Sequence, residues 1–545
     1  MASTALAGGE SLASPRYDHG IDRPAPRWAR WLFLGLMVGV VGYAGASVIA
    51  DTRAVGEQLA TGVFLFLGVA LLIALGFEFV NGFHDTANAV ATVIYTNAMP
   101  APLAVVWSGV WNFLGVMTSS GAVAYSILTL LPVELILNVG STAGYAMIFA
   151  LLIAAVTWNL ATWYVGLPNS SSHALIGSIL GVGLANQLMS SGPAGTSGVD
   201  WSQASKVLNG LWMAPLIGFG AAFVLLLVMK AVSRNPDLFR APEADTPPPR
   251  GIRALLILTC TGVSFAHGSN DGQKGMGLIM LILIGAAPTA YALNRTMPAT
   301  STPGYVASAN AATAAFAAHG RPVGDVARSR QVLTDALKAK QLASPTVFGA
   351  AAVVNGDITR RIAEYGAIRN VPGAATANLR SDMYLVLDVT QRVVKANPAG
   401  LSEGELATLG AHKAQLEQGT RYIPTWVKVA VALALGLGTM VGWKRIVVTV
   451  GEKIGKTHLT YGMGAAAELV AATTIFAADR FALPVSTTHI LSSGVAGASV
   501  ANGAGLQART VRNLALAWVM TLPVAMALSG GLYWLFLALA RTAGF

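Results

Sequence analysis

The chain has 545 residues, of which 54% are hydrophobic and only 11% are charged. An average soluble domain carries about a quarter charged residues, so this composition excludes a soluble globular enzyme, a disordered regulator and a coiled coil. The excess of 35 Lys and Arg over 25 Asp and Glu indicates loops held in the cytoplasm rather than a nucleic-acid partner. We therefore expect an all-α polytopic membrane protein.

The N-terminal part divides into a polar tail and an apolar segment. Residues 1–28 are polar and contain Pro15, Pro24 and Pro26, and they are interpreted as a disordered cytoplasmic tail. Residues 29–52 are interpreted as an extra N-terminal transmembrane segment, because their apolar run can span a bilayer core of about 30 Å. A cleaved signal peptide is the alternative, since Ala44-Gly45-Ala46 resembles a cleavage site, but the long tail favours a retained anchor.

Further apolar stretches follow along the chain, and one polar segment separates them. The stretches lie near residues 62–100, 103–131, 143–165, 167–189, 207–230, 252–289, 424–443, 460–480, 483–502 and 511–540. Residues 290–423 carry charges of both signs in helical patterns, which predicts an inserted soluble helical domain. The predicted organisation is a first membrane repeat at 60–230, a basic cytoplasmic linker at 231–251, and a second membrane repeat at 252–289 and 424–545.

Two motifs recur in the same order, which indicates a duplication. Phe79-x-x-Gly82-x-x-Asp85-x-x-Asn88 returns as Phe265-x-x-Gly268-x-x-Asp271-x-x-Lys274, at an offset of 186 positions (79 to 265). Leu167-Pro168-x-Ser170-x-x-His173 returns as Leu483-Pro484-x-Ser486-x-x-His489, at an offset of 316 (167 to 483). The two offsets differ by 130 positions, which is close to the length of the polar insert. We infer that the membrane unit is duplicated and that the insert lies in the second copy.

Loop charge predicts the orientation of the two copies. The basic loops are 230–253, 444–456 and the loop with Arg509 and Arg512. Placing them in the cytoplasm requires five crossings per repeat, if each motif segment counts as one interrupted crossing. An odd number makes the repeats inverted, as in many secondary transporters, and puts residues 290–423 outside, because long loops translocate largely regardless of charge.

Asp85 and Asp271 lie inside apolar segments, where an ionisable group costs about 3 kcal/mol and indicates a functional site by default. The structural alternative is that each carboxylate only caps a broken helix. Carboxylates with Asn carbonyls suit a hard cation or a proton, whereas Asn amides or Lys274 suit an anion. Glu78 is a further proton or cation candidate, with an interfacial residue as the alternative. The candidates for the coupling proton or cation are Asp85, Asp271, Glu78, His84 and His267.

The Ser/Thr-containing motifs 168–173 and 484–489 predict two helix starts, because Pro favours the first turn and Ser or Thr caps free N–H groups. Two helix N-termini within the membrane would form an anion site, whereas ordinary capping at the surface is the alternative. The predicted substrate-binding residues are Asp85, Asn88, Asn270, Asp271, Lys274, Ser170, Ser171, Ser172, Ser486, Thr487 and Thr488, and the secondary candidates are Asn81, His173 and His489.

Residues 81–89 (NGFHDTANA) and 267–275 (HGSNDGQKG) resemble the paired signatures of the inorganic phosphate transporter (PiT) family, and most closely its bacterial low-affinity, proton-coupled branch. The resemblance implies a secondary transporter with inverted repeats, often a homodimer, that carries phosphate with protons or sodium. In the bacterial branch it implies import of a neutral complex of phosphate with a divalent metal such as Mg²⁺. By family pattern Asp85, Asn88, Asn270 and Asp271 line the central site, and the Ser/Thr loops bind phosphate. Many members have Asn where this chain has Lys274, whose fixed charge favours protons over sodium.

The sequence predicts a phosphate:proton symporter of the bacterial inner membrane, without a catalytic role, a cofactor or a fixed metal site. Its expected partners are phosphate, protons, the lipid bilayer and a second copy of the chain. A sodium-coupled phosphate or sulfate symporter is the alternative; sulfate is disfavoured because it offers Asp85 no proton. The alternatives from a different functional class are an anion channel and an intramembrane hydrolase; a hydrolase would need a Ser and a His side chain that face each other. Ser172 and His173 are adjacent, and adjacent helical side chains do not face each other.

Overall fold

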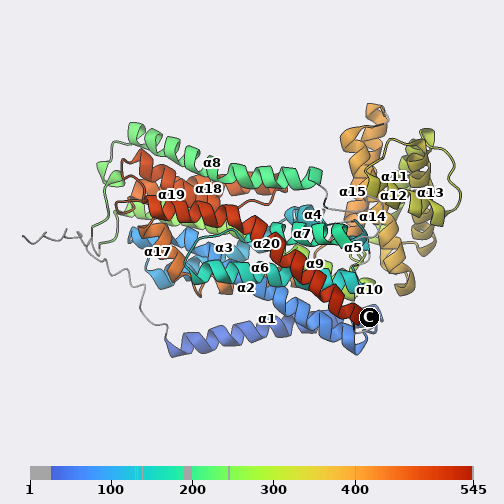
Figure 1. The fold of residues 1–545 in the computed structure, drawn as a ribbon, viewed down its shortest axis with the longest axis horizontal. Coiled ribbons are helices and arrows are strands. Elements are labelled where there is room, and N and C mark those ends of the chain that lie inside the picture. The colour runs from blue at the N-terminus through green and yellow to red at the C-terminus, as the bar shows by residue number, and fades with distance from the viewer. Residues whose placement is uncertain are drawn as a thin grey trace, which may run out of the picture.

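The structure, a computed structural model, describes residues 26–128, 130–131, 133–137, 139–189, 199, 201–243, 246–398 and 400–542. These residues form α-helices and three short 3₁₀ helices, without a β-strand among them (Figure 1). In chain order they are α1 (Arg27–Ala54), α2 (Thr61–Tyr95), α3 (Ala101–Thr118), α4 (Ala122–Leu128), α5 (Val133–Leu137), α6 (Thr142–Tyr164), α7 (Ser171–Met189), α8 (Trp201–Val232), η1 (Pro236–Phe239), α9 (Arg250–Ala286), α10 (Pro288–Tyr291), η2 (Ala299–Ser301), α11 (Thr302–Ala318), α12 (Val326–Ala339), α13 (Pro345–Tyr365), η3 (Ile368–Asn370), α14 (Gly373–Ala396), α15 (Glu403–Thr420), α16 (Thr425–Gly438), α17 (Lys444–Glu452), α18 (Tyr461–Arg480), α19 (Thr487–Ala501) and α20 (Ala508–Thr542).

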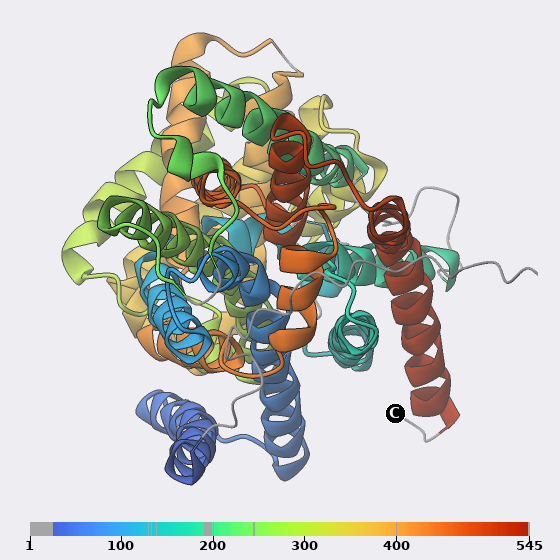
Figure 2. The same cartoon turned by 90° about the vertical axis from the view of Figure 1, so that its left-hand side faces the viewer.

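Eight helices of the described chain are long and apolar enough to cross a membrane: α1, α2, α3, α6, α8, α9, α18 and α20. This confirms the predicted all-α polytopic class. The stretches 424–443 and 483–502 contain α16 and α19, which have only 14 and 15 residues. Helices of this length extend about 21–23 Å, less than the bilayer core, so neither spans it alone. α1 and the last turns of α20 lie at the periphery of the bundle (Figure 2).

The helix contacts come in matching pairs, as a duplication predicts. α3 packs on α9 as α16 packs on α2, α6 packs on α2 as α18 packs on α9, and α7 packs on α20 as α19 packs on α8. The guanidinium Nε of Arg253, in the first turn of α9, donates to the carbonyl of Ala98 just after α2, at 2.8 Å. α2 and α9 therefore run in opposite directions. Inverted repeats require that equivalent helices such as α2 and α9 run antiparallel. The inversion of the whole repeat stays a prediction.

The Asp motifs lie within unbroken helices, contrary to the expectation of an interrupted crossing at each motif. Asp85 lies in α2 and Asp271 in α9, and both helices continue for several turns on either side. An unbroken helix satisfies its own backbone hydrogen bonds, so only side chains have to be neutralised at this depth. The helical interruptions occur at the Ser/Thr motifs, where α6 ends at Tyr164 before α7 and α18 ends at Arg480 before α19.

The glycines of the two Asp motifs allow close helix contacts. A Cβ on Gly82 would lie 2.2 Å from the carbonyl oxygen of Leu435 on α16, and one on Gly268 would lie 2.1 Å from that of Asn112 on α3. No side chain fits against backbone at these distances. Small residues of this kind let membrane helices approach closely, and here they hold the Asp-bearing helices against α16 and α3.

We expect Gly268→Ala to lower the thermal unfolding midpoint of the detergent-solubilised protein. The added methyl group overpacks the contact between α9 and α3, which costs about 1–3 kcal/mol. Gly39→Ala is the matched control, because a Cβ there meets no atom within 4 Å. Equal midpoints for the two variants would contradict the close-packing role of Gly268.

The inserted segment forms its own helical bundle. Helices α11–α15 contribute to a hydrophobic cluster that is separate from those of the membrane part, and they gather at one end of the molecule (Figure 1). Within it, the buried Asp382 carboxylate pairs with Arg330 (Nε to Oδ1, 2.6 Å) and with Arg361. Burial lowers the pKa of His412 to about 4, so this imidazole is neutral at physiological pH and bonds to Asn355 Oδ1 at 2.8 Å.

The basic loops meet at the opposite end. Tyr95, at the end of α2, donates to Glu452 Oε1 at 2.7 Å, and Asn97 donates to the carbonyl of Glu243 at 3.3 Å. Gln507, just before α20, donates to the carbonyl of Gly455 at 2.7 Å. The three basic loops thus share one end of the bundle and the insert lies at the other, the arrangement on which the predicted orientation depends.

Candidate functional site

The candidate site lies where the two Asp-bearing helices, α2 and α9, meet the starts of α7 and α19, through hydrogen bonds of Asp85 and Lys274 to residues of the Ser/Thr motifs. Ser170 Oγ accepts the N–H of His173 at 3.2 Å, and Ser486 Oγ accepts the N–H of His489 at 3.1 Å. Both serines are buried N-caps, as the sequence predicted. The imidazole rings of His173 and His489 lie 4.5 Å apart, so the two helix starts meet in the interior.

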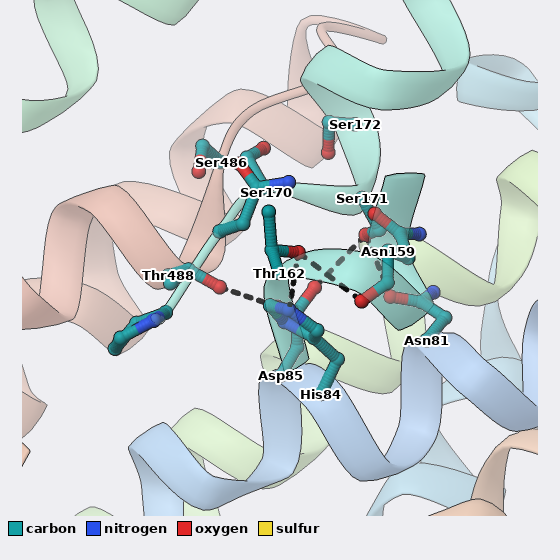
Figure 3. Close-up of polar contacts among 12 residues, drawn as sticks. Asn81, His84, Asp85, Asn159, Thr162, Ser170, Ser171, Ser172, Ser486 and Thr488 are labelled. Carbon is teal, nitrogen blue, oxygen red and sulfur yellow. Dashed lines mark hydrogen bonds and ion pairs between the residues drawn. The ribbon is translucent and has the colours of Figure 1, made fainter. Parts of the chain in front are cut away.

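Asp85 connects both helix starts to α2. Its Oδ2 accepts the hydroxyl of Ser171 on α7 at 2.9 Å, and its Oδ1 accepts the hydroxyl of Thr488 on α19 (Figure 3). The side chain is 2% exposed. A carboxylate that accepts two hydroxyl groups from different helices fixes their positions relative to each other, because charge-assisted hydrogen bonds are among the stronger ones.

Lys274 makes the corresponding connection from α9. Its ammonium Nζ lies 2.7 Å from Asp271 Oδ1 and also donates to the Ser172 hydroxyl. Ser172 in turn donates to the carbonyl of Val485, at 2.8 Å, in the second Ser/Thr motif. Both charged side chains are fully buried. The fixed positive charge predicted for Lys274 is thus inside the site and compensates Asp271.

His267 lies between the two aspartates. Its Nδ1 is 2.6 Å from Asn112 Oδ1, and the Asn112 amide nitrogen donates to the carbonyl of Ser108 at 2.9 Å. Because that amide is oriented by Ser108, Nδ1 carries the proton. The other nitrogen, Nε2, is 3.9 Å from Asp85 Oδ2 and 3.5 Å from Asp271 Oδ2. A neutral imidazole would place a lone pair against two carboxylates, so this position favours an added proton or a cation.

His84 approaches Asp85 from the other side in the same manner. Its Nε2 lies 3.3 Å from the Thr162 hydroxyl, which itself donates to the carbonyl of Trp158 at 3.0 Å. Nε2 is then the donor, and Nδ1 is left 3.4 Å from Asp85 Oδ1. His84 and His267 thus each turn towards Asp85 the ring nitrogen that is unprotonated in the neutral imidazole. That nitrogen carries a proton only when the ring is positively charged.

Asn81 and Asn270 hold the Ser/Thr motifs beside the Asp motifs. Ser171 Oγ lies 2.7 Å from Asn81 Oδ1 as well as near Asp85, and one hydroxyl has only one proton to donate. Asn270 Nδ2 donates to the carbonyl of Leu483 at 3.2 Å. The Asn81 amide nitrogen and the Asn270 side-chain oxygen are buried without a partner among the described atoms, as is the Thr487 hydroxyl. These groups could bind a substrate.

Glu78 lies at the edge of this cluster. It is fully buried on α2, and a Cβ on Gly275, the residue after Lys274, would lie 2.2 Å from its Cγ. Neither carboxylate oxygen of Glu78 has a hydrogen-bond partner among the described residues. The interfacial alternative for Glu78 is therefore wrong, because an interfacial carboxylate reaches water. The side chain of Asn88 lies outside the described residues.

The sequence interpretation missed several residues of the site. Asn112 orients His267, Thr162 bonds to His84, and Asp479 Oδ1 accepts Gln273 Nε2 at 2.6 Å on the turn that carries Asp271. Each is a polar residue within or beside an apolar segment, which was the available signal. Spacing could not show that α3, α6 and α18 bring them to the aspartates.

The geometry does not form a hydrolytic pair. Ser172 bonds to Lys274 and to the Val485 carbonyl, and the His173 ring packs on His489, so neither side chain is directed at the other. What the site can do is bind charged species. It combines two carboxylates and an imidazole, whose ligand atoms lie within 4.8 Å of one another, with a buried ammonium and two helix N-termini.

The chain is similar to known phosphate transporters over most of its length. The sequence pattern of the phosphate transporter family matches residues 81–529. The low-affinity inorganic phosphate transporter PitA of Escherichia coli (strain K12) is 42% identical over 499 residues, covering 88% of this chain and 98% of PitA. PitB of the same strain is 39% identical over 523 residues, covering 88% and 99%, and the probable low-affinity inorganic phosphate transporter of Bacillus subtilis (strain 168) is 28% identical over 475 residues, covering 87% and 98%. A solved structure named as the sodium-dependent phosphate transporter is similar at a TM-score of 0.46, with 18% identity over 86% of this chain and 98% of its own.

The matched region includes residues 81–89 and 267–275 and both Ser/Thr motifs, and it leaves out α1, the first part of α2 and the end of α20. The family assignment made from residues 81–89 and 267–275 is confirmed, and with it a multi-pass membrane transporter rather than an enzyme. The chain belongs to the phosphate transporter family.

Proposed function

We propose that this chain imports inorganic phosphate across the bacterial inner membrane in symport with protons, with phosphate carried as a neutral complex with a divalent metal. The observation that supports proton coupling is the position of His267. Its Nε2 lies near Asp85 and Asp271, while its Nδ1 is hydrogen-bonded to Asn112. A proton shared among these three groups replaces repulsion by attraction. Its loss changes the net charge next to the substrate site.

The anion is expected at the starts of α7 and α19. The first N–H groups of a helix have no acceptor within it, and they carry the positive end of the helix dipole. The Ser170 and Ser486 hydroxyls accept capping bonds and keep a proton to donate, and the Thr487 hydroxyl has no partner among the described residues. Hydrogen phosphate fits such donors and can also donate its own proton to a carboxylate, which sulfate cannot do.

The divalent metal would enter as part of the substrate. Asp85, His267 and Asp271 offer ligand atoms within 4.8 Å of one another, and the two carboxylate oxygens among them suit Mg²⁺. Lys274 supports protons over sodium, because its buried ammonium already compensates Asp271. Rocking of one repeat against the other, with homodimers as the working assembly, completes the proposal.

The test is labelled-phosphate uptake into proteoliposomes with an imposed pH gradient. We expect accumulation above equilibrium that needs the gradient and Mg²⁺ but not Na⁺. Each pH unit supplies about 1.4 kcal/mol per coupled proton, so the accumulation ratio should rise about tenfold per unit for one proton. Sodium-dependent uptake would overturn proton coupling, sulfate uptake would overturn the choice of anion, and strictly downhill flux would indicate a channel.

A further inference from the structure

Glu468 is a buried carboxylate that the central site does not use. It lies in α18 with no exposed surface. Thr259 on α9 donates its hydroxyl to Oε2 at 2.5 Å, and Thr92 on α2 donates its hydroxyl to Oε1. No Lys, Arg or His lies within ion-pair distance of it in the described part of the chain. An ionised carboxylate without a countercharge is costly at membrane depth, so this position favours a bound proton.

The hydrogen bonds around Glu468 suit both protonation states. The Thr259 hydroxyl is also 3.1 Å from the carbonyl of Leu256 in its own helix. When Glu468 is ionised, Thr259 can donate to it. When Glu468 is protonated, it can donate to Thr259, which then donates to Leu256. A group that keeps its hydrogen bonds in both states can gain and lose a proton without leaving a buried polar atom unpaired.

Glu468 lies between the central cluster and the end of the bundle with the basic loops. Thr92 comes two helical turns after Asp85 on α2, about 10 Å along the axis, in the direction of Tyr95 and Glu452. Thr259 comes about two turns before His267 on α9, on the side of Arg253. Glu468 is therefore about two turns from Asp85 and His267, towards the side predicted to be cytoplasmic.

Polar side chains lead from His267 in this direction. His267 bonds to Asn112, whose amide is 3.2 Å from the Ser108 hydroxyl, and Ser108 is 2.8 Å from the Ser264 hydroxyl. Cys260, one turn before Ser264 on α9 and next to Thr259 in the sequence, is buried and is the titratable residue of this stretch of α9. Among the described residues, α2, α8, α19 and η1 place no charged partner against Glu468.

We propose that Glu468 is a second proton-binding residue, which passes the coupling proton between the central cluster and the cytoplasmic side. This relay rests on the proton coupling proposed above. At the offset of the second motif, the position equivalent to Glu468 (468 to 152) is Leu152 in the first repeat. The duplication therefore supplies this carboxylate on one side only, as a one-sided proton path requires.

The test compares two transport modes of Glu468→Gln in proteoliposomes. Gln can accept from one threonine and donate to the other, so the variant should fold. We expect exchange of labelled for unlabelled phosphate at equal pH, which needs no net proton transfer, to stay within about twofold of the wild-type rate. Accumulation driven by a pH gradient should fall about tenfold or more. If exchange and accumulation are lost in parallel, Glu468 only holds the helices in place and the relay is wrong. If neither exchange nor accumulation changes, the relay is also wrong.

A second readout is independent of transport. Infrared difference spectra between acidic and alkaline buffer should contain a carboxylic-acid band that Glu468→Gln removes, and retention of every such band would overturn proton binding at Glu468. Thr259→Val should shift this band, whereas Thr473→Val is the matched control, because within the described part of the chain the Thr473 hydroxyl bonds to the backbone of its own helix. If the pH gradient does not drive phosphate accumulation by the wild-type protein, both the proton coupling and the relay are wrong. The infrared band shows independently whether Glu468 binds a proton.

Discussion

Asp85→Asn should lower proton-driven phosphate accumulation about 10²-fold or more. The carboxylate accepts the Ser171 hydroxyl from α7 and the Thr488 hydroxyl from α19, and it faces a nitrogen of His84 and one of His267. Hydrogen bonds to a charged group contribute about 1.5–3 kcal/mol each, and Asn keeps one acceptor oxygen, so the variant loses one of these bonds and the charge assistance of the other, at a cost of about 2–3 kcal/mol. The amide also replaces one acceptor oxygen by a donor and removes the charge that attracts the proton.

The measurement is labelled-phosphate accumulation in proteoliposomes at matched protein density, with monodispersity in detergent as the folding check. Asp237→Asn is the control, because Asp237 is an exposed residue of η1 that pairs with Arg240 away from the site. A folded Asp85→Asn protein that accumulates phosphate like the Asp237→Asn variant would remove Asp85 from the coupling and binding machinery.

Lys274→Met should both destabilise the protein and stop transport. The ammonium is 2.7 Å from Asp271 Oδ1, and both side chains are fully buried. Breaking one partner of a buried ion pair costs about 3–5 kcal/mol, because the other charge is left uncompensated. The thermal unfolding midpoint in detergent should therefore fall clearly, and phosphate uptake should fall to background.

The double variant Lys274→Met with Asp271→Asn separates the two effects. Removing both charges should restore most of the unfolding midpoint, since no charge is then left unpaired, but uptake should stay at background. Recovery of uptake in the double variant would show that the pair only holds α9 in place. A single Lys274→Met variant with wild-type stability would contradict the buried ion pair itself.

The sequence was sufficient for the membrane class and the family, and it predicts a duplication and a set of site residues. Asp85 and Asp271 could be identified because charge in an apolar segment is costly and therefore informative at a single position. The Ser/Thr motifs could be identified because helix capping is local and depends on a few adjacent residues. Glu468 satisfies the same rule as the aspartates within the stretch 460–480, so the sequence contained a signal for it that was not used.

Continuity of α2 and α9 through the Asp motifs was not predicted. The count of five crossings per repeat treats each motif segment as interrupted, and Asn, Gly and Asp have low intrinsic helix propensity. Tertiary packing overrides that preference, because Gly82 and Gly268 lie directly against backbone of α16 and α3 and hold the helices in contact. The sequence pattern contained the glycines, but not the helices that they contact.

By itself, the sequence determined which residues are polar at membrane depth, that they occur twice, and to which family the chain belongs. Only the tertiary structure decided that His267, which lies one turn before Asp271 on α9, also faces Asp85 on α2, and that Thr92 and Thr259 meet Glu468. The physical reason is that burial cost and capping act on each segment alone, whereas these contacts join helices hundreds of positions apart. Their partners are set by how the helices pack, which no local pattern encodes.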